Sequence, residues 1–262
     1  ALCRTLDLDG LARERVMGEM EKALTRSGRP SRCFEALREM GQLEPWLKEV
    51  AALIGVKQRA DCHPEGDAWT HTMLVVDEAA KLRDEAKNPT GLMLAALLHD
   101  VGKAVAMQEK DGVIHAYGHE TAGVPLAEEF LQRLTGEKAL CRYVLNMVEL
   151  HMKPNLYAAQ NSGQKAWNRL FDRSACPEDL LLLAKADHRG RINAAPYAET
   201  ERMIRARLSA YEEMMARPHI TGADLLARGI QPGEEMGRLL EEAHRLRLAG
   251  GKKEDALRQM RL

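Results

Sequence analysis

The chain has 262 residues, of which 45% are hydrophobic and 29% charged, and its formal net charge is −1. This length and balance are typical of a soluble globular protein with ample core, not of a disordered chain. The near-neutral charge excludes a global basic field, so nucleic-acid binding would have to use local patches. Apolar runs are too short to span a membrane and no signal pattern is found, so we expect a cytoplasmic protein.

The five cysteines are odd in number, scattered along the chain, and include no C-x-x-C pair. This pattern predicts reduced thiols and argues against a disulfide framework or a thiolate zinc site. β-Branched residues are scarce, whereas Ala, Leu, Glu, Arg and Met dominate. We therefore predict an all-α fold.

The first quarter of the chain predicts three helices, at residues 9–27, 31–40 and 43–54. A loop over residues 55–68 follows them. Asp67, at the end of this loop, is expected to cap the next helix, which carries His71 in its first turn. His63 lies inside the loop, and we interpret it as a loop residue and not as a metal ligand.

An apolar stretch at residues 92–98 runs directly into His99 and Asp100. Periodicity cannot separate a buried helix from a buried strand here, but the Ala and Leu content and a start signal at Asn88-Pro89 favour a helix. A histidine and a carboxylate at the end of a buried helix cost free energy unless something pairs them. A divalent metal would do so.

A loop with a turn at Asp111-Gly112 is expected over residues 105–118. Pro154 is expected to stop the second of the helices that follow, and Pro218 to break the long one. These helices are predicted at residues 118–134, 137–152, 164–174, 177–187, 197–216, 223–228 and 233–248, with a short final helix after Gly250-Gly251.

Six titratable side chains near helix ends are candidate metal ligands: His71, His99, Asp100, His119, His151 and Asp187. Four imidazoles with two carboxylates suit Mn, Fe, Co, Ni or Zn better than Ca, which prefers oxygen alone. A bridging carboxylate can hold two metals about 3.5–4 Å apart, and such a pair can deprotonate a shared water for attack on phosphorus.

Three basic residues are candidate phosphate ligands. Lys103 lies one turn after His99, whereas Arg189 and Arg191 lie two and four residues after Asp187. The alternative for all three is surface solvation or charge at a helix end. A further histidine, at position 115, lies four residues before His119, but the loop character between them leaves His119 as the only candidate of that pair.

The order H…HD…H…H…D on a helical chain resembles the HD superfamily of metal-dependent phosphohydrolases. The local phrases agree, namely His71-Thr72, Leu98 to Lys103, Gly118-His119-Glu120 and Ala186-Asp187. The resemblance implies that His71, His99, Asp100 and Asp187 are core metal positions, and that His119 and His151 serve members with two metals. One or two divalent ions are therefore expected, drawn from Mn, Fe, Ni, Co, Mg or Zn.

The resemblance extends to the body and tail of bacterial CCA-adding tRNA nucleotidyltransferases. It rests on Arg-Pro-Ser at 29–31, Leu-Arg-Glu-Met-Gly at 37–41, His-Pro-Glu-Gly-Asp at 63–67, Ala-Asp-His-Arg-Gly-Arg at 186–191 and a tail from Ile220-Thr221-Gly222 through Pro232-Gly233. It implies an HD-domain helical bundle at 61–218, between a helical lead-in at 1–60 and a helical tail at 219–262.

The motifs of the nucleotidyltransferase head, which are a Gly-Ser turn, a carboxylate pair and an Arg-rich segment, are not found in these residues. CCA addition is therefore not expected. A fragment of a longer protein and a free-standing descendant both fit the sequence.

The favoured function is hydrolysis of nucleotide or RNA-terminal phosphoesters, which include 2′,3′-cyclic phosphodiesters, 2′-nucleotides and phosphomonoesters. We expect metal-bound hydroxide to attack, with Asp100 bridging the metals, Lys103 and Arg189 on phosphate, and water protonating the leaving group. One alternative is a tRNA-binding body whose catalytic head is absent. Another is a structural metal site, although six spread ligands beside Lys and Arg favour open positions. The sequence leaves the oligomeric state open.

Overall fold

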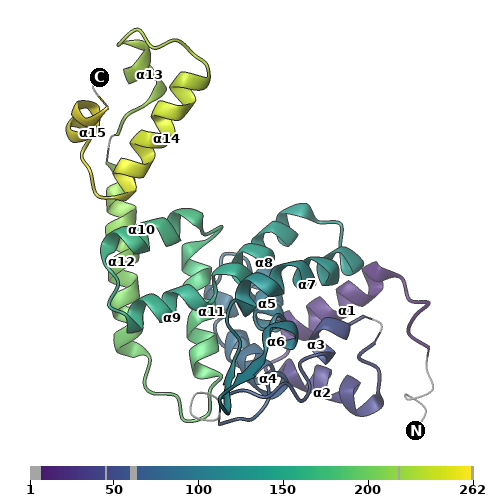
Figure 1. Cartoon of the computed structure of the whole chain (residues 1–262). Coiled ribbons are helices and arrows are strands. Elements are labelled where there is room, and N and C mark those ends of the chain that lie inside the picture. Colours follow the sequence, from purple (N-terminus) through teal and green to yellow (C-terminus); the bar gives the residue numbers. More distant parts are fainter. Residues whose placement is uncertain (1–6, 45, 60–63, 218, 261–262) are drawn as a thin grey trace. The chain divides into compact units, whose positions relative to one another are not determined.

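The computed structural model describes residues 7–44, 46–59, 64–217 and 219–260 (Figure 1). Almost all of its regular structure is helical, which confirms the predicted all-α fold. The only strands among these residues are β1 (Gln108–Lys110) and β2 (Val113–His115), an antiparallel hairpin in which Lys110 pairs with Val113. The prediction of a plain loop there was wrong, although the Asp111-Gly112 turn is present and joins the strands.

The chain divides into two compact units, residues 1–156 with 174–201 and residues 157–173 with 202–262. The predicted division at residues 60 and 218 follows sequence character instead, and it stays a prediction. The first unit contains α1 (Arg13–Arg26), α2 (Ser31–Met40), α3 (Lys48–Ala51), α4 (Ala68–Ala80), the 3₁₀ turn η2 (Arg83–Glu85), α5 (Pro89–Leu98), α6 (Lys103–Ala106), α7 (His119–Leu134), α8 (Lys138–Leu150) and α11 (Pro177–Arg189).

The second unit contains α10 (Gln164–Arg173), α13 (Gly222–Leu226), α14 (Glu234–Leu248) and α15 (Lys253–Gln259). The boundary between the units falls within α9 (Met152–Ala159) and near the start of α12 (Ala198–Ala216). In the second unit, α13 begins with a capping box in which Thr221 and Asp224 exchange hydrogen bonds. A small core of Ile220, Leu225, Ala243 and Ala256 holds the last helices together.

Helix α5 lies at the centre of the first unit and packs against α4, α8 and α11. Its start follows the predicted signal, because the Asn88 side chain accepts a hydrogen bond from the Gly91 amide at 2.9 Å and Pro89 needs no amide partner. Residues 92–98 have no exposed surface. Each fully buried leucine among them contributes roughly 1.5–3 kcal/mol of transfer free energy, so the end of α5 is held rigidly.

Helix α4 begins at the predicted cap. One Asp67 carboxylate oxygen accepts from the Thr70 amide at 2.9 Å, and the other accepts from the Gly55 amide at 2.7 Å. The cap satisfies an amide that has no partner within the helix. It also fixes the loop before the helix and places His71 in the first turn, as predicted.

Two predicted helix boundaries were wrong. Pro154 does not end the helical path, because it is the third residue of α9, where a missing amide removes no hydrogen bond within the helix. The helix expected over residues 43–54 shortens to α3, with turns on either side. Pro218 and His63 lie outside the described residues. No helix in the described part of the chain is both long and apolar enough to cross a membrane.

Candidate metal centre

The six candidate ligands come together inside the first unit, each from a helix end or first turn. All are buried, with at most 5% of any residue exposed. His71 lies in the first turn of α4, and His99 and Asp100 directly follow α5. His119 begins α7, His151 lies between α8 and α9, and Asp187 lies near the end of α11.

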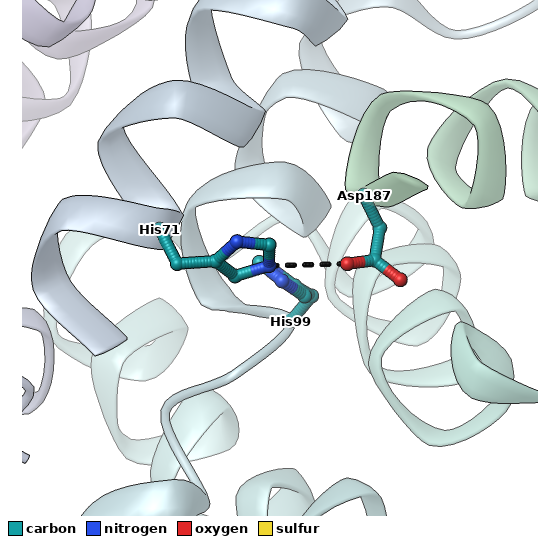
Figure 2. Close-up of side chains that lie close together, drawn as sticks. All are labelled: His71, His99 and Asp187. Atoms are coloured by element: carbon teal, nitrogen blue, oxygen red, sulfur yellow. Dashed lines mark hydrogen bonds and ion pairs between the residues drawn. The ribbon is translucent and has the colours of Figure 1, made fainter. Parts of the chain in front are cut away.

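The first group of ligands consists of His71, His99 and Asp187 (Figure 2). One nitrogen or oxygen of each lies within 4.8 Å of the others. The His71 Nε2 atom is 3.1 Å from Asp187 Oδ1, and the rings of His71 and His99 have centroids 5.6 Å apart. Three separate helical elements therefore present ligand atoms at the spacing that a single ion requires.

The second group consists of Asp100, His119 and His151, again with one ligand atom each within 4.8 Å. His119 Nε2 lies 3.1 Å from Asp100 Oδ1 and 3.4 Å from His151 Nε2. Two ring nitrogens at this separation both point lone pairs at one place unless a proton lies between them. A cation in that place would satisfy both.

Asp100 connects the two groups. Its Oδ2 atom lies 3.2 Å from His99 Nε2 and 3.8 Å from His71 Nε2, on the side of the first group. Its Oδ1 atom faces the second group, 3.1 Å from His119 Nε2 and 3.8 Å from His151 Nε2. One oxygen for each group is the arrangement of a carboxylate that bridges two ions.

The opposite nitrogen of every imidazole is engaged by an oxygen. Three rings bond through Nδ1 to the carbonyl oxygen three residues earlier, at 2.9 Å in His99, 2.8 Å in His119 and 2.7 Å in His151. The Nδ1 atom of His71 lies 2.8 Å from Glu65 Oε1. An Nδ1–H that donates to such an acceptor leaves the Nε2 lone pair directed into the centre, which is how metal-binding histidines are usually fixed.

Glu65 is a site residue that sequence reasoning missed. Its side chain is fully buried, and its second oxygen accepts from the Ile192 amide at 3.3 Å, just beyond α11. In the sequence, Glu65 stands out only as part of the His-Pro-Glu-Gly-Asp motif of a loop. A carboxylate shortly before a helix cap is the only local signal, and such residues are usually solvated.

Two carboxylates stay ionised despite their burial. Burial raises the pKa of Asp100, but the charges of His99 and Lys103 outweigh it and hold the pKa well below its usual range. For Asp187, burial is again outweighed, here by the hydrogen bond from His71 and by a nearby guanidinium, so its pKa is also well below the usual range. Both groups therefore supply negative charge for a cation.

The histidines differ in their proton affinity. Burial lowers the pKa of His71, but its contact with Asp187 outweighs this effect, so the pKa is raised overall. The contact with Asp100 does the same for His119. Burial next to other imidazoles lowers the pKa of His151 to about 3. His151 is therefore a neutral ligand at any ordinary pH.

A cavity of about 220 Å³ opens onto this centre, and Asp100, His119 and Asp187 are among its lining residues. Lys103 also lines it, with its amine 2.6 Å from Asp100 Oδ2 and 2.6 Å from Gln58 Oε1. Gln58 was not predicted, since nothing in its sequence context marks it. A backbone bridge between Lys57 and Asp67 holds its loop beside the cavity.

The two predicted arginines lie in different places. Arg191 lines the cavity and its guanidinium is 3.5 Å from Asp187 Oδ2. Arg189 is exposed and does not line the cavity; it lines a second hollow with Glu78 and Tyr197, to which Arg191 also contributes. Arg191 is therefore better placed than Arg189 to meet a ligand of the centre, and the predicted role of Arg189 on phosphate stays a prediction.

The residues fit a divalent transition metal. Imidazole nitrogens combined with carboxylates suit Mn, Fe, Co, Ni and Zn. Two buried ligand atoms, His99 Nε2 and Asp187 Oδ2, form no hydrogen bond with the described residues, although charged or polar partners lie 3.2 and 3.5 Å away. A bound cation is a partner that would satisfy both of these atoms.

Residues 68–192 match the HD domain family, and residues 5–54 match the family described as the probable RNA and SrmB-binding site of polymerase A. The chain therefore contains an HD domain, the domain of a superfamily of metal-dependent phosphohydrolases, and HD domains bind divalent metals. This confirms the HD resemblance that the histidine and aspartate pattern indicated.

Among curated proteins, the chain is similar to multifunctional CCA proteins. It is 38% identical over 250 residues to that of Burkholderia cenocepacia, which is 92% of this chain and 56% of the relative. It is 36% identical over 194 residues to that of Actinobacillus pleuropneumoniae serotype 5b, which is 71% of this chain and 46% of the relative. The chain spans about half the length of these relatives, and the resemblance to CCA-adding proteins is confirmed.

Proposed function

We propose that this chain is a metal-dependent phosphohydrolase that acts on nucleotide or RNA-terminal phosphoesters. Its substrates would be 2′,3′-cyclic phosphodiesters, 2′-nucleotides or phosphomonoesters. The observation that carries the proposal is Asp100, whose two oxygens each face one group of ligands at the wall of a cavity. A structural metal site would not need an open cavity at its bridging ligand.

Each side chain has a distinct part in this proposal. When bound, a pair of divalent ions supplies a water of lowered pKa and neutralises phosphoryl oxygens. Asp100 would present one carboxylate oxygen to each group, and Glu65 orients the His71 ring. Lys103 and Arg191 place positive charge on the cavity wall, where they would bind phosphate oxygens. Gln58 holds the Lys103 amine in position.

Hydrolysis of 2′,3′-cyclic AMP tests the proposal. The purified chain would be stripped of metal and reloaded with Mn, Ni, Co, Mg or Zn, beside an Asp100→Ala variant. We expect turnover that depends on metal and disappears in the variant. A matched control is Asp84→Ala, since its side chain is 99% exposed. Failure of every metal to give turnover, in protein shown to bind metal, would overturn the proposal.

A second function, tRNA binding, is favoured by the family match at residues 5–54 and by the names of the relatives. It would add to hydrolysis and not replace it. Retention of labelled tRNA over a series of salt concentrations tests it, because contacts to phosphate weaken steeply as salt increases. Absence of retention at about 50 mM salt would exclude this second function.

A further inference from the structure

The cavity at the metal centre carries an aromatic surface that the proposed function does not use. His115, the last residue of β2, and Tyr117 stack with ring centroids 4.8 Å apart and planes at 16°. Both residues line the cavity, and Tyr117 is 81% exposed. Single exposed aromatic residues are common on protein surfaces. This one is distinguished by its place on the cavity wall and by the second ring behind it.

The chain ties this aromatic pair to the second group of ligands. Tyr117 lies two residues before His119, so their Cα atoms are at most about 7 Å apart. Gly118 between them has a φ of +73°, which turns the chain into α7. The His119 ring is bonded to the Ala116 carbonyl at 2.8 Å, so this short segment and the ligand are fixed together. A group bound on Tyr117 would lie close to one bound at the metals.

The chemistry of the cavity has two parts. Lys103 and Arg191 provide positive charge beside the ligand groups, whereas Met107, Ile114 and Tyr117 provide apolar and aromatic wall. A phosphate joined through a short sugar to a flat aromatic ring matches both parts. An aliphatic phosphoester would match only the first.

We infer that the Tyr117 ring, backed by His115, stacks on the nucleobase of the substrate, so that the site prefers nucleoside phosphoesters to aliphatic ones. This inference rests on the proposed function and names its substrate class. A base stacked on one aromatic side chain strengthens binding by about tenfold or more, and every base offers a suitable face. We therefore expect preference for a base, with little selection among bases.

The first test measures binding without turnover. Saturation-transfer NMR would detect adenosine on the metal-free wild-type chain and on the variants Tyr117→Phe, Tyr117→Leu and Val113→Ala. Val113 is the matched control, because it is 40% exposed on the same hairpin and is not among the cavity-lining residues. We expect a signal in wild type, Tyr117→Phe and Val113→Ala, and its loss in Tyr117→Leu. No signal in wild type, or an unchanged signal in Tyr117→Leu, would overturn the inference.

The second test measures preference in the metal-loaded chain. We expect Tyr117→Leu to lower the ratio of kcat/KM for 2′,3′-cyclic AMP to that for glycerol 2-phosphate about tenfold. A short RNA with a 2′,3′-cyclic end, run in parallel, shows whether a terminal base of RNA is bound in the same way. An unchanged ratio contradicts the inference. A third outcome separates the two proposals. If Tyr117→Leu abolishes the adenosine binding seen in wild type, but the metal-loaded wild-type chain hydrolyses none of these substrates, the proposed function is contradicted and the aromatic binding site is still supported.

Discussion

The two groups of ligands share Asp100 but are built differently. In the first group, the His71 ring is held by the carboxylate of Glu65, and Asp187 adds a second charge directly. In the second group, both rings are held only by backbone carbonyls, and Asp100 is its one carboxylate. A carboxylate behind a histidine makes it a more basic ligand. The first group should therefore bind a divalent ion more tightly.

The second group is expected to bind its ion less tightly, but it is the more exposed of the two to the cavity. Two of the three ligands of the second group, Asp100 and His119, line the cavity, whereas Asp187 is the one ligand of the first group that does. From these differences in ligand basicity and in exposure, we expect the two groups to have different roles. The first group would retain its ion, and the second would present an ion to substrate.

Substitution of the shared residue should affect both groups. We expect Asp100→Ala to reduce bound metal from two ions to at most one and to remove detectable turnover. In the metal-free state it leaves the buried Lys103 amine without its charged partner and with only the Gln58 contact, which costs roughly 3–5 kcal/mol of unfolding free energy. Elemental analysis and urea unfolding measure the two effects. Two ions retained by Asp100→Ala would refute the shared role.

The carboxylate behind His71 should matter for the first group alone. We expect Glu65→Gln to weaken the tighter metal-binding step by about 10- to 100-fold, as measured by competition with a chromophoric chelator. Glu120→Gln is the matched control, because Glu120 lies 3.8 Å from His119 Nδ1, which already bonds to a carbonyl. Equal effects of the two variants would contradict the proposed difference between the groups.

Protons should compete with metal at His71 in the first group and at His119 in the second. The raised pKa values of His71 and His119 mean that their charged forms stabilise the metal-free fold at low pH, and that this contribution is lost as pH rises through those values. Below them, metal affinity should rise about tenfold for each pH unit. His151, with a pKa of about 3, should release no proton. At a pH below the pKa of His119, a pH-stat titration should count one proton released on binding of the ion of the second group, and two protons at that step would contradict the assignment.

The two arginines should separate by their position. We expect Arg191→Ala to raise KM for 2′,3′-cyclic AMP roughly fivefold, which corresponds to the loss of about 1 kcal/mol from one partly exposed charged contact. Arg189→Ala should leave KM unchanged, since Arg189 lies outside the cavity. Steady-state kinetics on the two variants measures which arginine contacts the phosphate. A larger increase of KM in Arg189→Ala than in Arg191→Ala would assign the contact to Arg189.

Local signals in the sequence predicted the helices that carry the site. Asp67 and Asn88 cap α4 and α5 as expected, because a cap depends on neighbouring backbone amides alone. The residue types and order of the six candidate ligands also sufficed to identify the HD family. Their convergence on one point could be inferred only through that resemblance, since residues 71 and 187 meet across more than a hundred positions.

Features that depend on tertiary contacts were missed. Glu65 and Gln58 gain their roles from a loop folded back over the centre, which no periodicity records. The hairpin at 108–115 consists of strands of three residues, too short for a pattern of alternation to be read. Arg191 lies four residues after Asp187 and pairs with it, whereas Arg189 lies two residues after it and so faces another side of the helix. Helical spacing could therefore have favoured Arg191, although we predicted both arginines as candidate phosphate ligands.

Anomalous diffraction from crystals grown with Mn²⁺ tests the central claim most directly. We expect two manganese peaks, one on each side of the Asp100 carboxylate, about 3.5–4 Å apart. The first should be ligated by His71, His99 and Asp187, and the second by His119 and His151. A single peak that does not touch Asp100, or an Asp100 carboxylate with both oxygens on one ion, would contradict a bridging role and with it the proposed mechanism.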